Sequence, residues 1–164
     1  MSTSVPALYG LFLVTGGIKN VEAAFSYRNF NDAWTKPPVW DYDAAFYNFG
    51  VHPYMGGMWY LASRNRHGGI IESFAISAFG TFSFEYIIES FSQQPSINDL
   101  ITTPLLGAAL GEASYQLIKK MKSDHHLNLP EKICITFLDP VEVLSRGFRY
   151  KKLATDCKAV PKIE

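Results

Sequence analysis

A long apolar region without a single basic residue constrains the fold of this chain most. From Gly69 to Ile118 the sequence contains five acidic residues and no Lys or Arg. Within it, the run IIESFAISAFGTFSFEYIIESF (residues 70–91) is separated by QQPS from a second, mostly apolar run over residues 97–121. Each run is long enough for a helix of about 30 Å, which is the thickness of a bilayer core. The pattern therefore predicts two helices joined by a short turn.

The turn between these helices contains residues that begin a helix well. Ser96 or Asn98 can cap the second helix, and Asp99 suits its positive N-terminal end. Further along, Gly107-x-x-x-Gly111 allows two helix backbones to approach closely. We therefore expect an antiparallel helix hairpin that packs tightly against another helix.

Composition favours a membrane protein over an ordinary soluble domain. Only 18% of the 164 residues are charged, whereas soluble domains average about 25%. The 15 basic residues are balanced by 15 acidic ones, so nothing predicts a nucleic-acid partner. Cys134 and Cys157 form no metal-type pair, and no disulfide framework is predicted.

The basic residues predict an orientation for the hairpin. Arg64, Arg66 and His67 precede its first helix, and a group of lysines at 119, 120 and 122 follows its second. The positive-inside rule then places both basic ends in the cytoplasm and the QQPS turn outside. This favours an inner membrane, with an outer membrane or the periplasm as alternatives.

The remaining segments divide the chain into three parts. Residues 1–25 form an apolar N-terminal helix, a cleaved signal-like segment or an irregular apolar segment. Residues 26–122 form the helical core; in it, residues 26–43 are predicted as an extended loop because of Pro37-Pro38, and a helix runs from Ala44 or Pro53 to Ser63. Residues 123–164 form an irregular polar tail with one apolar run, ICITFL, that suits a short strand or a helical turn. The fold class is all-α, a membrane-embedded or membrane-associated bundle built round the hairpin.

The acidic residues of the hairpin are the candidate functional groups. Glu85 and Glu89 lie one helical turn apart, and Asp99 begins the next helix, so the turn brings them together. An ionised carboxylate in hydrocarbon costs about 2.5–3.5 kcal/mol, so these groups face a polar interior or stay neutral. Their candidate partners are His52, Arg64, Arg66 and the tyrosines at 54, 60 and 86, while Glu112 has no evident partner.

Three interpretations of these acids are open. They form a structural network that fixes helix register, or a carboxylate-rich site for a cation or polar substrate, or an acid/base centre with His52. The candidate catalytic residues are His52, Glu85, Glu89 and Asp99. No metal or cofactor is assigned.

Standard catalytic signatures such as G-x-S-x-G, H-E-x-x-H and the P-loop are absent from the sequence. The leading function is therefore a non-enzymatic envelope protein that binds the bilayer, a lipid, a small polar ligand or an envelope protein. One alternative is a membrane-embedded hydrolase or transferase acting on a lipid or envelope glycan. Another is a soluble helical domain with a structural polar network.

The order of three motifs resembles a known family. NFGVHPYMGGMWYLASRNRHG, FSFEYIIES and PSINDLITTPLLGAALGE are similar to the pattern of the bacterial family called domain of unknown function 3943, over roughly residues 40–115 and more loosely through FLDPVEVLSRGFRY. Phe84 replaces that family's usual Trp. The resemblance implies an envelope protein of Gram-negative bacteria and no particular activity. A weaker likeness to VanZ-like membrane proteins supports the hairpin alone. The polar residues that match the family pattern are Asn48, His52, Arg64, Glu85, Glu89, Ser96, Asn98, Asp99 and Glu112.

Overall fold

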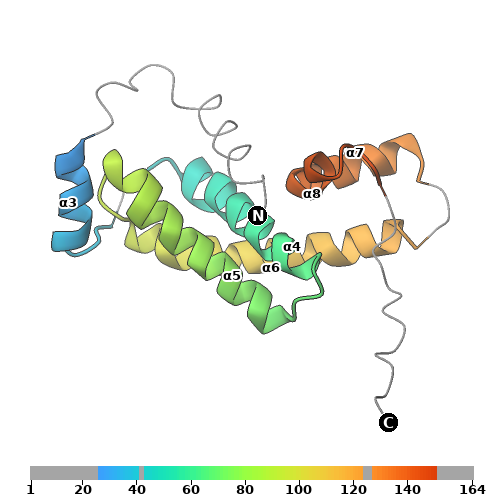
Figure 1. The fold of residues 1–164 in the computed structure, drawn as a ribbon, viewed down its shortest axis with the longest axis horizontal. Helices are drawn as coiled ribbons and strands as arrows, with labels where there is room; N and C mark the ends of the chain where they lie inside the picture. Colours follow the sequence, from blue (N-terminus) through green and yellow to red (C-terminus); the bar gives the residue numbers. More distant parts are fainter. Residues whose placement is uncertain (1–25, 41–42, 124–126, 151–164) are drawn as a thin grey trace, which may run out of the picture.

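The computed structural model describes residues 26–40, 43–123 and 127–150, and every regular element in these ranges is helical (Figure 1). The all-α prediction is confirmed. The elements are α3 (Tyr27–Thr35), the π-helical turn η1 (Tyr47–Val51), α4 (His52–Arg64), α5 (Ile70–Ser83), the π-helical turn η2 (Phe84–Ile88), the 3-10 turn η3 (Glu89–Phe91), α6 (Ile97–Met121), α7 (Leu129–Leu138) and α8 (Pro140–Ser145).

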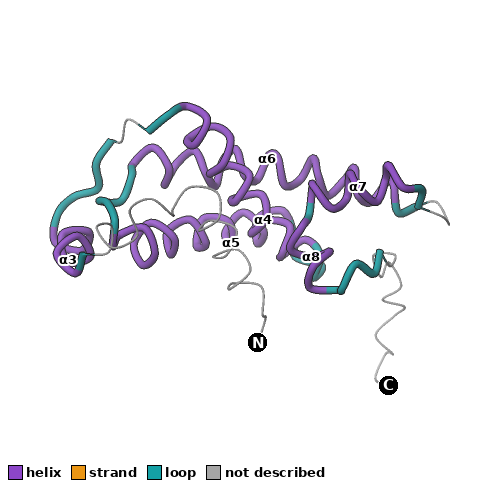
Figure 2. Tube along the Cα trace, turned by 90° about the horizontal axis from the view of Figure 1, so that it is seen from above, coloured by secondary structure: helices purple, strands orange, loops and turns teal. Residues whose placement is uncertain are grey.

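Three helices form the centre of the molecule. α4 packs chiefly against α6 and also against α5, and α5 packs against α6. α6 is the longest described helix; α3 lies near one end of this group, and α7 and α8 lie near the other (Figures 1 and 2). Gly56 lies against Thr103 and Tyr60 against Gly111, so α4 and α6 run in the same direction. The N-terminal end of α4 is therefore next to the turn that begins α6.

Glycine allows the close approach of α4 and α6. A Cβ atom on Gly56 would lie 2.3 Å from the carbonyl oxygen of Thr103, and one on Gly107 would lie 2.7 Å from the Cα of Gly56. No side chain fits at such distances. A Cβ on Gly111 would likewise lie 2.8 Å from the ring of Tyr60. The expectation that Gly107-x-x-x-Gly111 packs closely on another helix is confirmed.

The second helix of the predicted hairpin is confirmed in its bounds. α6 covers Ile97–Met121, and Ser96 caps it by accepting a hydrogen bond of 3.1 Å from the backbone N–H of Asp99. The first helix covers the predicted residues 70–91, but it changes type on the way: α5 ends at Ser83, and the chain continues as the π-helical turn η2 and the 3-10 turn η3.

A membrane-spanning hairpin is not supported. Among the described residues, no helix combines the length and the apolar character needed to cross a bilayer. α5 has only 14 residues, and α6, which has 25, carries Asp99, Glu112, Lys119 and Lys120.

The extended loop predicted before α4 is wrong in its first half. α3 covers Tyr27–Thr35, with Ser26 as its N-cap accepting from the N–H of Arg28. Pro37 and Pro38 follow the helix and do not interrupt it. Proline therefore excludes a helix at residues 37 and 38 but not in the residues before them. The helix is held by aromatic packing: the Phe30 ring stacks on Phe91 at 4.8 Å.

The prediction of an irregular C-terminal tail is also wrong over residues 127–150, where α7 and α8 form. Asn128 and Glu131 make a capping box at the start of α7. Asp139 ends α7 and caps α8, accepting from the N–H of Glu142. Ile135 and Val143 then pack on Ile118 of α6, which gives the two short helices a core. The predictions for residues 1–25 lie outside the described residues.

Candidate functional site

Four titratable side chains, His52, Glu85, Glu89 and Asp99, gather where four elements meet, and we call them the acidic cluster. His52 begins α4, Glu85 lies in η2, Glu89 begins η3, and Asp99 lies in the first turn of α6. One ligand atom from each of His52, Glu85 and Asp99 lies within 4.8 Å of the others. His52 Nε2 and Asp99 Oδ2 lie 3.9 Å apart. Glu85 and Asp99 are completely buried, and His52 is 7% exposed.

The turn before α6 holds Glu85 in this position. The backbone N–H of Ser96 donates to Glu85 Oε2 at 2.9 Å, and the hydroxyl of the same serine caps α6 next to Asp99. The turn is itself fixed by a parallel bridge with Val39, whose N–H donates to the carbonyl of Pro95 and whose carbonyl accepts from the N–H of Ile97. The segment after α3 thus serves as a support for the acidic cluster.

Burial makes the carboxyl groups of Glu85 and Glu89 weaker acids than usual. Desolvation raises the pKa of Glu85, and the nearby charges of Glu89 and Asp99 raise it further, against the opposing hydrogen bond from Ser96. Desolvation also raises the pKa of Glu89, with the charges of Asp99 and Asp43 next in effect. Glu85 and Glu89 share a hydrogen bond when one of them carries a proton. The cluster therefore favours a bound proton or a bound cation over three free negative charges.

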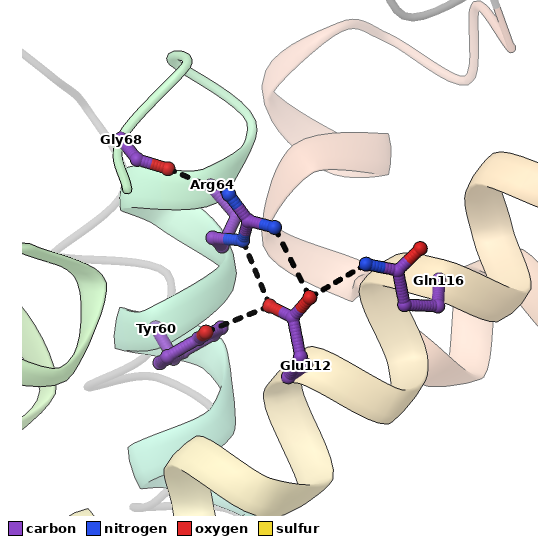
Figure 3. A network of polar contacts seen from close by, with 5 residues as sticks. All are labelled: Tyr60, Arg64, Gly68, Glu112 and Gln116. Atoms are coloured by element: carbon purple, nitrogen blue, oxygen red, sulfur yellow. Dashed lines mark hydrogen bonds and ion pairs between the residues drawn. The ribbon is translucent and has the colours of Figure 1, made fainter. Parts of the chain in front are cut away.

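A second polar network lies further along α4 and α6, around Glu112 (Figure 3). Arg64 holds this carboxylate with two nitrogens, Nε at 2.8 Å and Nη2 at 3.1 Å. Tyr60 donates its hydroxyl at 2.7 Å, and Gln116 donates its amide at 2.6 Å. Arg64 also donates to the carbonyl of Gly68, which ties the loop before α5 to the network. Glu112, for which no partner was evident from the sequence, thus accepts hydrogen bonds from Tyr60, Arg64 and Gln116.

The partners of Glu112 keep it ionised. Burial opposes the charge, but the hydrogen bonds from Arg64, Tyr60 and Gln116 outweigh it, and the pKa of Glu112 is lowered. Burial and the Glu112 contact raise the pKa of Tyr60 to about 12. The Arg64 guanidinium also lies 4.2 Å from the centre of the Tyr115 ring. This is a bidentate ion pair with further hydrogen bonds to Gly68, Tyr60 and Gln116, which is the arrangement of a structural link.

The residues predicted as one polar cluster thus occupy two places. His52, Glu85, Glu89, Ser96 and Asp99 lie at the start of α6. Arg64 and Glu112 lie together elsewhere, in contact with Tyr60. Asn48 is buried in η1, the turn that leads into His52, and Asn98 is buried in the first turn of α6 beside Asp99.

Several partners were missed by reasoning from the sequence. Gln116 lies four residues after Glu112, and this spacing was a signal that could have found it. Asn65 donates to Asp139 at 2.7 Å across 74 residues, and no local signal indicates such a pair.

Comparison with known families assigns the chain. The model of the family described as domain of unknown function (DUF3943) matches residues 37–141. The chain belongs to this family. The match extends from the segment that supports the acidic cluster into α8, and so contains both polar networks. A search of curated proteins and a search of solved structures each found no match. The likeness to VanZ-like membrane proteins is not supported by these comparisons.

Proposed function

We propose that this DUF3943 domain is a non-enzymatic binding module of the bacterial envelope that docks on the lipid bilayer through α5 and α6. The observation that carries the proposal is where the large apolar side chains lie. On α5, Ile71 is 85% exposed and Phe79 is 67% exposed, and on α6 Leu105 is 55% exposed. Further exposed apolar residues on the two helices are Ile70, Phe74, Ile76, Phe82, Ile101, Leu106, Leu110 and Leu117.

The buried faces of the same helices carry small and polar residues. On α5 these are Ser73, Ser77 and Thr81, spaced four residues apart, and the Ser77 hydroxyl donates to the carbonyl of Gly56. Gly107 and Gly111 are buried on α6. Helices that associate in an apolar solvent pack through small residues and direct their large apolar residues outward. A protein surrounded by water shows the opposite arrangement, and exposed apolar patches of this kind mark interaction sites.

Features at the edges of this face fit a lipid surface. An open hollow of about 390 Å³ lies between α5 and α6, and its lining includes Ile70, Ile71, Phe74 and Ala108. Arg66, Lys119 and Lys120 are exposed towards the end of the bundle where α4 stops. Basic side chains beside an apolar face suit anionic headgroups. The hollow suits acyl chains, since its other lining residues contribute little polar surface.

The burial of the acidic cluster favours a non-enzymatic role. His52, Glu85 and Asp99 are the groups that acid/base chemistry on a lipid or glycan would need, and all three are buried. Their enclosure favours a bound proton or ion over contact with a large substrate.

Flotation with vesicles of phosphatidylethanolamine and phosphatidylglycerol tests the proposal. The wild-type chain is expected to float with the vesicles, and a variant with Ile71→Gln, Phe79→Gln and Leu105→Gln is expected to stay at the bottom of the gradient. These positions are exposed, so the variant keeps its fold, which circular dichroism checks.

The matched control carries three glutamines on another helix, Leu129→Gln, Ile133→Gln and Phe137→Gln on α7, which are also exposed. This control is expected to float like the wild type. A wild-type chain that does not float contradicts the proposal. A second result would also contradict it: the wild type is an oligomer that does not bind lipid, and the α5–α6 substitutions make it monomeric. The exposed face would then bind a second copy of the chain.

A further inference from the structure

The acidic cluster brings together the donor atoms of a metal site. An imidazole from α4, a carboxylate from η2 and a carboxylate from α6 place their ligand atoms within 4.8 Å of one another. In a tetrahedral zinc site with bonds of about 2.0–2.2 Å, neighbouring ligand atoms are about 3.3–3.6 Å apart. His52 Nε2 and Asp99 Oδ2, at 3.9 Å, are already close to that separation. His52 of α4 therefore joins two carboxylates that the short turn before α6 brings together, and a purely packed interior does not require this.

Two buried oxygens of the acidic cluster indicate what is bound there. Glu85 is completely buried, yet apart from a proton shared between the two carboxyl groups, no donor of the described chain reaches its Oε1 or the buried Oε2 of Glu89. The negative charges of Glu89 and Asp99 act on Glu85, and those of Asp99 and Asp43 act on Glu89. Arg64, which the sequence offered as a partner for these acids, forms its ion pair with Glu112 instead. Buried negative charge of this kind requires a counter-ion or protons.

We propose that His52, Glu85 and Asp99 bind a divalent transition-metal ion, with Glu89 adjacent as a further carboxylate ligand. The proposal is independent of lipid docking, because the acidic cluster lies inside the bundle and the apolar face lies outside it. The ion links the N-terminal end of α4, the π-helical turn after α5 and the first turn of α6. Its role is to fix the three elements in register.

The donor set selects the class of metal. One imidazole nitrogen with two or three carboxylate oxygens suits Zn²⁺ or Mn²⁺. Mg²⁺ and Ca²⁺ prefer oxygen ligands throughout and are expected to bind more weakly. Soft ions such as Cu⁺ favour sulfur ligands, and the cysteine of the described chain, Cys134, lies on α7 and outside this cluster.

The test uses the full chain, stripped with a chelator and titrated with Zn²⁺ and separately with Mn²⁺. Calorimetry is expected to give one ion per chain, and the melting temperature is expected to rise with the first equivalent and fall again on chelation. Glu85→Gln, Asp99→Asn and His52→Gln are each expected to weaken binding by at least about tenfold, since even outer-shell partners of metal sites change affinity about 10- to 100-fold.

Asp139→Asn is the matched control. Asp139 is, like Asp99, a buried aspartate at the start of a helix, but it is the N-cap of α8 and lies between α7 and α8. This variant is expected to bind the metal like the wild type. If the cluster variants do not fold, Co²⁺ added to the wild-type chain still gives a result, since visible absorption bands of a tetrahedral or five-coordinate ion are expected. Absence of stoichiometric binding to the folded wild type overturns the proposal and leaves protons as the counter-ions. Equal binding by the wild type and folded cluster variants also overturns it.

Discussion

At the scale of single residues, Glu112 shows how one carboxylate joins three segments of the chain. Its oxygens accept hydrogen bonds from α4 through Tyr60 and Arg64, and from its own helix through Gln116. Arg64 extends the link to the loop before α5. Because the ion pair is bidentate and only partly exposed, it contributes more to stability than an ordinary surface pair.

Glu112→Gln is therefore expected to lower the free energy of unfolding by about 1–3 kcal/mol. The pKa of Glu112 is lower in the folded chain than in the unfolded one. Its contribution is complete above the unfolded pKa and is lost as the pH falls through the folded pKa. Chemical denaturation should thus show a wild-type advantage that is constant near neutral pH and shrinks below about pH 5.

The control for this prediction is Asp32→Asn, which removes an exposed i,i+4 pair with Lys36. It is expected to change stability by less than about 0.5 kcal/mol. A Glu112→Gln variant as stable as the wild type at neutral pH would contradict a structural role for the network.

At the scale of secondary-structure elements, the contact of α4 with α6 depends on glycine. The carbonyl of Thr103 occupies the place where a side chain of Gly56 would be, so the two backbones touch directly. Helix propensity alone favours alanine at this position by about 1 kcal/mol. The packing therefore overrules the local preference.

Gly56→Ala is expected to destabilise the chain by about 1–3 kcal/mol, because a Cβ at 2.3 Å forces the helices apart. Gly69→Ala is the control: nothing lies within 4 Å of its Cβ position, and its φ of −69° suits alanine. That variant should be neutral or slightly more stable. Thermal unfolding of both variants measures the difference, and a Gly56→Ala variant that melts above Gly69→Ala would show that the contact is not tight.

At the scale of the whole molecule, the α7–α8 pair is a small unit docked on the end of α6. Its core consists of Ile118, Ile135 and Val143, and Asn65 donates to Asp139 from the end of α4. The Tyr54 hydroxyl adds a hydrogen bond of 2.6 Å to the carbonyl of Phe137. So small a core predicts that this unit opens at lower free energy than the α4–α5–α6 centre.

Ile135→Ala is expected to remove about 2–4 kcal/mol of local stability. Hydrogen exchange read by mass spectrometry should then speed up in α7 and α8 and stay unchanged in α4 and α6. Ile133→Ala makes the same chemical change on the same helix at a position that is 50% exposed, and should leave exchange nearly unchanged. Uniform acceleration over all helices in Ile135→Ala would mean that the described chain unfolds as one unit.

Features that depend on neighbouring residues could be predicted from the amino-acid sequence. The helical class, the bounds of α6, its Ser96 cap and the close packing of Gly107 and Gly111 all follow from capping chemistry, breakers and small-residue spacing. The nearness of Glu85 to the start of α6 follows from the short turn between them.

The contacts between side chains far apart in the sequence could not be predicted in this way. His52 joins Glu85 and Asp99, and Arg64 joins Glu112 across 48 residues, because α4 runs parallel to α6 in a register that glycine contacts set. α3 owes its place to stacking on Phe91, and α7 and α8 owe theirs to Ile118. Such contacts depend on packing between segments far apart in the chain, and local sequence patterns do not predict this packing.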